Sequence, residues 1–169
     1  MEKNTEFIFH KYDGTPISNV NEYVKKWYSE NPNGDIIIGC DSQEHSNYIK
    51  YAITVIMHKI DEHGIGHGAH VIYSTIKDYS KAAKSDLYTK LWLETEYTVE
   101  AAKLFDDCVK KPVIHLDYNS KDSEYSNVHY QSGIGYARGM GFKAKGKPDA
   151  WGASHTADAI CKTKNFIKV

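Results

Sequence analysis

Two short apolar segments that each run into an aspartate constrain this chain more than any other feature. Residues 35–41 read Asp-Ile-Ile-Ile-Gly-Cys-Asp, and residues 113–117 read Val-Ile-His-Leu-Asp. Short apolar runs between turn residues are typical of strands buried on both faces, where a carboxylate is costly to place. A metal ion or a partner charge at the strand end would explain the acid. A turn-forming aspartate is the alternative for Asp41 taken alone, since Asp-Ser is common in turns.

The remaining patterns predict a single α/β domain over residues 1–169, in which residues 1–33 form an extension whose helix packs on the rest. A glycine-rich hairpin joins two strands, so the first three strands should be antiparallel. The strand that reaches Asp117 follows a long helix and should run parallel to its neighbour. We therefore expect a mixed five-stranded sheet flanked by helices, with an extra N-terminal helix. The expected helices are 19–30, 85–108, 127–140 and one from Pro148 through Lys162, and the other strands are 48–60, 71–77 and 142–147.

Composition and cysteine usage point to a cytoplasmic protein without a membrane partner. Hydrophobic residues make up 41% of the chain and charged residues 25%, which is ordinary for a globular domain. The sequence contains no apolar run near the length that crosses a bilayer, and its first residues do not form a signal peptide. The three cysteines are far apart in the sequence and lack a CxxC pair, which indicates reduced thiols rather than a zinc site.

Two further acidic residues interrupt predicted helices. Glu94 falls on the apolar stripe of the long helix, whereas Glu96 and Glu100 fall off it. Asp158 lies among small residues in the last predicted helix, and His155 precedes it by three positions on the same helix face.

These acids can form one site. If the strand carrying Asp117 lies beside the strand carrying Asp41, the two carboxylates meet at one sheet edge, and the two helices can bring Glu94 and Asp158 there. Clustered carboxylates repel one another, and hard ions such as Mg²⁺ or Mn²⁺ relieve that repulsion. Two such ions can activate water and stabilise a leaving oxygen, so the chemistry suggests phosphodiester hydrolysis.

Four motifs carry a resemblance to a known family. They are Gly39-Cys40-Asp41-Ser42-Gln43, Leu116-Asp117-Tyr118-Asn119, Lys147-Pro148-Asp149-Ala150, and Ala153-Ser154 leading to Ala157-Asp158. Over about residues 7 to 162 the chain resembles the ribonuclease-H-like superfamily, which includes ribonuclease H, RuvC-type resolvases and retroviral integrases, and more narrowly the YkuK family. The resemblance implies a ribonuclease-H-like fold and a divalent-metal-dependent nuclease.

The resemblance also implies residue roles. Asp41, Glu94, Asp117 and Asp158 would hold Mg²⁺ or Mn²⁺, with two ions expected, and His155 would bind metal or position water. Asp149 is a rival to Asp158, although an acid there also suits the start of a helix. The substrate would be RNA or DNA, and a homodimer would favour a junction substrate, because resolvases act as dimers.

A basic C-terminal region supplies candidate phosphate contacts on a chain whose formal net charge is -1. A solvated lysine-rich surface is the alternative. The candidates are Lys143, Lys145, Lys147 and Lys162.

Several alternatives stay open at this point. The chain could be a catalytically silent nucleic-acid-binding module of the same fold. A nucleotide phosphotransferase is disfavoured, because the link after Asp41 lacks the glycines of a phosphate loop. Ser42 and Gln43 carry no assigned chemistry beyond a hydrogen bond to a ligand or to the substrate. Four histidines lie around the hairpin, and imidazole suits several transition ions, but the glycine-rich loop gives little rigidity for preorganised ligands and favours an exposed tip over a metal site; they are His58, His63, His67 and His70.

Overall fold

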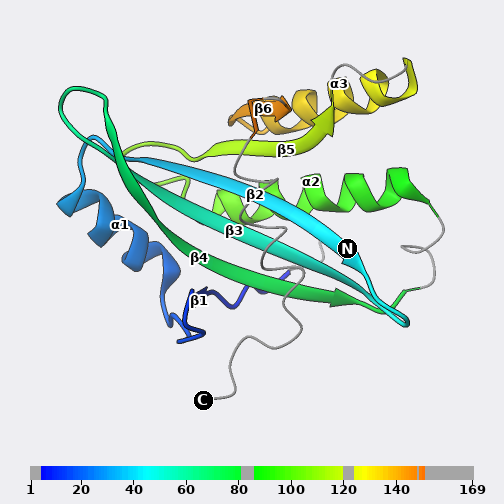
Figure 1. Ribbon diagram of the computed structural model, residues 1–169, viewed down its shortest axis with the longest axis horizontal. Helices are drawn as coiled ribbons and strands as arrows, with labels where there is room; N and C mark the ends of the chain where they lie inside the picture. The colour runs from blue at the N-terminus through cyan, green and yellow to red at the C-terminus, as the bar shows by residue number, and fades with distance from the viewer. Residues whose placement is uncertain (1–4, 81–85, 120–123, 148, 151–169) are drawn as a thin grey trace.

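The computed structural model describes residues 5–80, 86–119, 124–147 and 149–150 (Figure 1). Within these residues six strands form one mixed sheet in the order β1-β4-β3-β2-β5-β6. The strands are β1 (His10–Lys11), β2 (Asp35–Glu44), β3 (Ile49–Ile60), β4 (Gly66–Asp78), β5 (Val113–Asn119) and β6 (Lys143–Lys147), and the helices are α1 (Val20–Glu30), α2 (Leu87–Lys103) and α3 (Glu124–Gly139).

The sheet topology confirms the expected α/β architecture. β2, β3 and β4 pair antiparallel, and β5 and β6 join them as parallel strands. The sixth strand, absent from the prediction, is the two-residue β1, which pairs with β4 at the opposite edge. None of the described helices is long and apolar enough to cross a membrane.

The predicted end of the first long strand at Asp41 was wrong. β2 continues to Glu44, because its antiparallel pairing with β3 runs on until Glu44 lies opposite Ile49. The turn comes later, where the His45 amide bonds to the Tyr48 carbonyl at 2.8 Å. Asp41 therefore lies inside a strand, opposite Ala52, and is not a turn residue.

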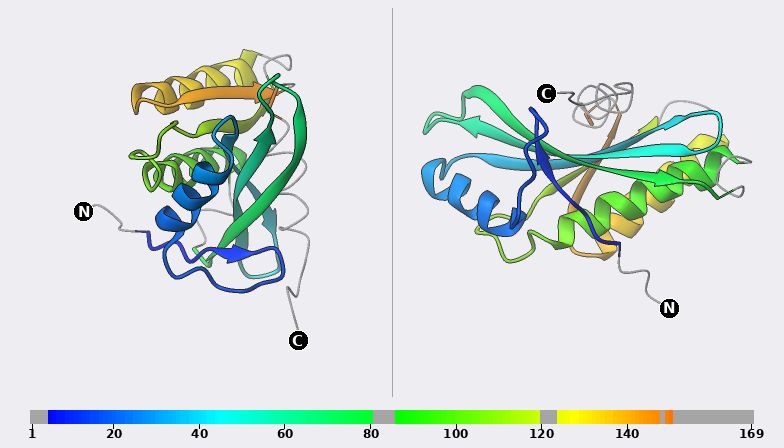
Figure 2. Two further views of the ribbon diagram at one scale, coloured as in Figure 1. Left: turned by 90° about the vertical axis from the view of Figure 1, so that its left-hand side faces the viewer. Right: turned by 90° about the horizontal axis from the view of Figure 1, so that it is seen from below.

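The three described helices lie on one face of the sheet, and Figure 2 shows them as a single layer. Their apolar side chains form one core with alternate residues of the strands. Tyr28 of α1 is 4% exposed, Phe105 after α2 is 0% exposed, and Ile134 of α3 is 3% exposed. The strand residues of this core include Ile36, Ile38, Cys40, Tyr51, Ile53, Ile114, Leu116, Tyr118 and Ala144.

The residues between these core positions point the other way, onto what we call the far face, the side of the sheet turned away from α1, α2 and α3. Asp41 follows the core residue Cys40, and Asp117 lies between the core residues Leu116 and Tyr118. Alternation along each strand therefore places both aspartates on the far face.

Helix starts and stripes were predicted with mixed success. Asn19 caps α1, and its side chain accepts the Glu22 amide at 3.1 Å. The long helix, expected to start at residue 85, begins at Leu87 after its cap Asp86, whose carboxylate accepts the Tyr88 amide. Leu87, the first residue of this helix, is 64% exposed, so the buried stripe of the helix does not include it.

Two glycines of α3 give a matched stability prediction. A Cβ on Gly133 would lie 2.6 Å from the Tyr118 ring, whereas a Cβ on Gly135 would meet nothing within 4 Å. We expect Gly133→Ala to destabilise the fold by about 1–3 kcal/mol through overpacking, and Gly135→Ala to stabilise it by about 0.5–1 kcal/mol through helix propensity. Urea unfolding midpoints measure both, and equal shifts of the same sign would contradict the packing account.

Candidate functional site

Asp41 and Asp117 lie on the neighbouring strands β2 and β5, just beyond the segment in which the two strands pair. β2 and β5 pair in parallel from Ile37 opposite Val113 to Gly39 opposite His115. Asp41 and Asp117 each follow the last of these pairs by two residues. Asp41 is half-buried, and the Asp117 side chain is 22% exposed. Two carboxylates therefore share the far face, partly open to solvent.

Glu94 approaches the same region from the helix side. It lies on α2, which packs across β2 and β5, and it is only 5% exposed. The Ser42 hydroxyl donates a short hydrogen bond to Glu94 Oε1. Because Ser42 follows Asp41 directly, their side chains leave opposite faces of β2. Ser42 thus holds Glu94 on the helix side of β2, whereas Asp41 projects from the far face of the same strand.

The charges of the two aspartates act on Glu94. The pKa of Glu94 is raised from 4.5 to about 8, chiefly by burial and also by the negative charges of Asp41 and Asp117, against the opposing Ser42 hydrogen bond and the Lys90 charge. The Glu94 carboxyl therefore carries a proton at neutral pH unless a cation joins the site.

A buried tyrosine ties the helix to the strand at this point. The Tyr118 hydroxyl donates to the Leu91 carbonyl at 3.0 Å and lies 3.0 Å from Thr95 Oγ1. Burial raises the pKa of Tyr118 to about 12, so its phenol stays protonated and able to donate. Since Tyr118 follows Asp117 and Thr95 follows Glu94, the contact fixes the spacing of the two acids.

One of the predicted phosphate contacts instead pairs with an acid of the site. Lys147 Nζ lies 2.5 Å from Asp117 Oδ1, and the lysine side chain is 40% exposed. The Lys143 and Lys145 side chains are exposed and project from the far face of β6. They flank Ala144, whose side chain lies in the core. β6 therefore lines the edge of the far face with three lysines.

The last predicted helix lies outside the described residues. Asp158, His155 and Lys162 thus remain predictions. Asp149 is exposed, and its charge acts on His115, a buried far-face residue whose pKa is lowered to about 4 by burial and by Lys145, with Asp149 opposing. The choice of Asp158 over Asp149 as a ligand stays a prediction.

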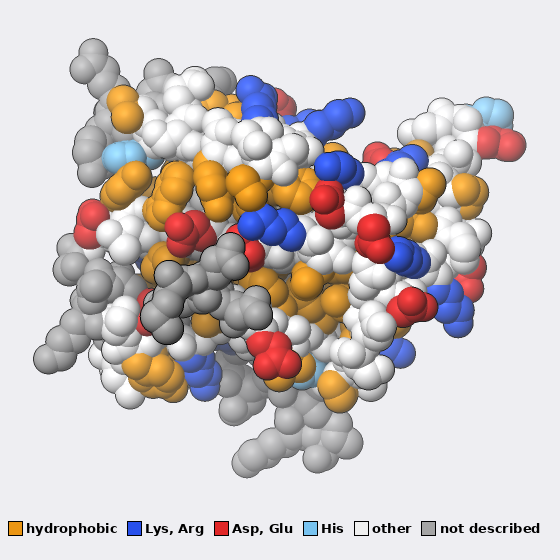
Figure 3. Space-filling view, turned by 180° about the vertical axis from the view of Figure 1, so that it is seen from behind, with side chains coloured by type: hydrophobic (Ala, Val, Ile, Leu, Met, Phe, Trp, Pro, Cys, Tyr) orange, Lys and Arg blue, Asp and Glu red, His pale blue; other side chains and the backbone are white. Residues whose placement is uncertain are grey.

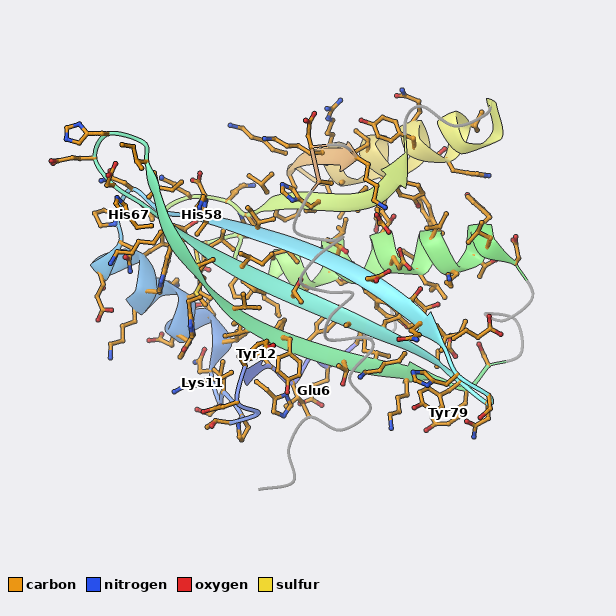
Figure 4. All side chains as sticks on the ribbon, in the orientation of Figure 1. Glu6, Lys11, Tyr12, His58, His67 and Tyr79 are labelled. Carbon is orange, nitrogen blue, oxygen red and sulfur yellow. The ribbon has the colours of Figure 1, made fainter. Side chains whose placement is uncertain are left out.

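The hairpin histidines each have separate surroundings. His67 pairs with Asp61 at 2.7 Å, and His70 lies 2.6 Å from the Tyr23 hydroxyl. His63, at the tip, has a side chain that is 74% exposed. Figure 4 shows His58 and His67 beside the β3–β4 hairpin, so the expected exposed tip is what the structure contains.

The donor set fits a hard divalent ion in its chemistry, since it offers three carboxylates and oxygen is the ligand that Mg²⁺ and Mn²⁺ prefer. The carboxylates have not converged, however. Across the described part of the chain, no three or more His, Cys, Asp or Glu side chains are grouped to hold an ion.

Sequence reasoning left two contacts of the site unassigned: it allowed Ser42 a hydrogen bond to a ligand without naming Glu94, and it did not predict the Lys147–Asp117 ion pair. The first had a usable indication, because alternation along a strand turns Ser42 toward the face that carries the helix stripe of Glu94. The second had none, since it depends on how β6 aligns with β5.

Fold and site together define an α/β protein with acids presented by two central parallel strands and a crossing helix. The chain matches the family Ribonuclease H-like over residues 17–162, and it belongs to that family. A search of curated proteins finds no match.

Proposed function

We propose that the protein is a divalent-metal-dependent nuclease that hydrolyses phosphodiester bonds of RNA or DNA. The observation that carries the proposal is the raised pKa of Glu94, to which Asp41 and Asp117 both contribute. Three acids from two strands and a helix lie within reach of one another's charge, at a site that is partly open to solvent. A buried acid whose pKa is raised by burial and by nearby charges is typical of functional sites.

Each residue has a role in the proposed reaction. Asp41, Glu94, Asp117 and Asp158 would hold one or two Mg²⁺ or Mn²⁺ ions, and His155 would bind metal or position the attacking water. When bound, such ions supply an activated water and a counter-charge for the leaving 3′ oxygen, giving 3′-hydroxyl and 5′-phosphate ends. Tyr118 holds the strand of Asp117 against the helix of Glu94, which keeps the acids in place.

Charge distribution supports substrate approach along β6. Figure 3 views the helix side, where acidic and basic side chains are intermixed and do not form a basic patch. Three lysines line β6 beside Asp117, and cations at that spacing suit a phosphate backbone. They are Lys143, Lys145 and Lys147.

The finer assignment to the YkuK family rests on the same residues. Its most specific motif runs from Gly39 to Gln43. Two residues of this motif have surroundings that suit the site: Asp41 lies on the far face, and the Ser42 hydroxyl donates a hydrogen bond to Glu94. A catalytically silent binding module is the second candidate. This candidate is favoured because the carboxylates of the described residues are not grouped to hold a metal ion.

A cleavage assay of the wild-type protein separates the two. The protein is treated with EDTA and then given Mg²⁺, Mn²⁺ or buffer, with hybrid, single-stranded and branched substrates. We expect cleavage only after metal is restored, with 5′-phosphate product ends. Size-exclusion chromatography of the same protein shows whether activity on branched substrates goes with a dimer. Binding to these substrates without turnover under either metal would favour the silent module.

A further inference from the structure

The Lys147–Asp117 pair places a cation where the proposed metal would bind. Lys147 Nζ lies 2.5 Å from Asp117 Oδ1, close enough for a charge-assisted hydrogen bond. An ammonium group is a compact point charge, so it neutralises a carboxylate much as a metal ion does, but with one charge instead of two.

Strand register explains why this lysine reaches the acid. His115 pairs with Lys145, but the next pair is Asn119 with Lys147, so four steps along β5 match two steps along β6. The extra residues of β5 form a bulge that contains Asp117, and bulges re-aim side chains beside functional sites. Lys147 thus faces the bulge, whereas Lys145 is held level with His115.

We infer that Lys147 is the resident counter-ion of Asp117 in the metal-free protein, and that a divalent ion displaces it toward the substrate. The inference rests on the proposed function, because it needs a metal at Asp41 and Asp117. A divalent ion interacts with all the carboxylates at once and competes well against one ammonium group. The lysine side chain is 40% exposed and sits on a flexible stem, so it can leave without disturbing the core.

The displacement has a functional consequence. Released Lys147 stays on the far face beside Lys145 and becomes available to a phosphate of the substrate. Metal binding would then raise the affinity for nucleic acid in two ways, because the ion adds its own positive charge and also frees a lysine. Lys145 is exposed whether or not metal is bound, and it should contribute equally in both states.

Metal affinity tests the first half of the inference without any cleavage. Mn²⁺ binding is measured by calorimetry for wild type, Lys147→Gln, Lys147→Arg and Lys145→Gln. We expect Lys147→Gln to bind Mn²⁺ about threefold to tenfold more tightly, because its competitor is gone. Lys147→Arg, which keeps the charge, and Lys145→Gln, which removes an equal charge from the same strand, should stay within about twofold of wild type.

Substrate affinity tests the second half. Binding of a single-stranded oligonucleotide is measured by fluorescence anisotropy, once in EDTA and once in Ca²⁺ as a metal that does not support cleavage. We expect Lys147→Gln to weaken binding about threefold in Ca²⁺ and to leave it unchanged in EDTA, while Lys145→Gln weakens both equally.

The outcomes separate the two proposals. If Asp41→Asn abolishes Mn²⁺ binding but Lys147→Gln leaves the affinity unchanged or weaker, the counter-ion inference is wrong and the metal site stands. If wild type shows no Mn²⁺ binding that Asp41→Asn removes, both are wrong. If Lys147→Gln weakens oligonucleotide binding equally in EDTA and Ca²⁺, Lys147 is a permanent phosphate contact, which overturns the displacement.

Discussion

Glu94→Gln should make the metal-free protein more stable than wild type at pH 8, and the advantage should disappear toward pH 5. Burial raises the pKa of Glu94 to about 8 in the folded state, while the unfolded chain keeps a value near 4.5. Between these two values the folded protein binds more protons than the unfolded chain, so its stability falls as pH rises. Glutamine has no proton to lose and escapes that loss.

The size of the effect follows from the pKa difference. A pKa difference of this size lowers the free energy of unfolding of the wild-type protein by at most about 4 kcal/mol between pH 5 and pH 8. Urea unfolding of both proteins at several pH values in EDTA measures it. Glu96→Gln is the matched control, because Glu96 lies two residues away on α2 and its carboxylate accepts the Trp92 indole N–H at 3.0 Å, a contact that glutamine keeps. It should leave the wild-type pH dependence in place.

The same unfolding measurement is repeated with Mg²⁺ in place of EDTA. A cation bound to the ionised Glu94 removes the cost of its charge, so Mg²⁺ at pH 8 should stabilise wild type and should stabilise Glu94→Gln much less. Unfolding curves of wild type and Glu94→Gln that stay parallel over the whole pH range would show that Glu94 is not the buried proton-binding group described here.

The fold was largely predictable because local and long-range patterns agree in this chain. The amphipathic stripe from Val20 to Tyr28 and the apolar run at Ile36–Ile38 each allow one structure only, and the long helix before β5 requires a parallel return. The sixth strand was missed because β1 has two residues, and its pairing with β4 leaves no periodic trace in the sequence.

The acids of the site were easier to find than their geometry. Glu94 was predicted as a carboxylate on a buried stripe, and it is buried. The place of Asp41 inside a strand was missed, because the polar residues after it resemble a turn, whereas pairing with β3 keeps them extended. The partners of Glu94 and Asp117 depend on side-chain alternation and strand register, which a linear sequence does not display. Those partners are Ser42 and Lys147.

Asp41→Asn should lower the metal-dependent cleavage rate by about a thousandfold or more, which corresponds to about 4 kcal/mol of transition-state stabilisation. Asparagine matches aspartate in shape and can still accept the Ser42 amide hydrogen bond, which is 2.9 Å long. What it lacks is the negative charge that the proposed metal site needs. Single-turnover cleavage with Mg²⁺, at equal protein and substrate occupancy, measures the loss.

The matched control is Asp35→Asn, which removes the same charge from the start of the same strand, where Asp35 lies 3.5 Å from Lys110 at the surface. It should cleave within about twofold of wild type, since a surface ion pair contributes little. A second readout keeps folding apart from chemistry. Removing the Asp41 charge relieves part of the repulsion on Glu94, so Asp41→Asn should lower the pKa of Glu94 and raise stability at pH 8. An inactive variant that is also more stable has lost a functional charge, whereas one that is inactive and less stable has lost its fold, and a fully active variant would remove Asp41 from the site.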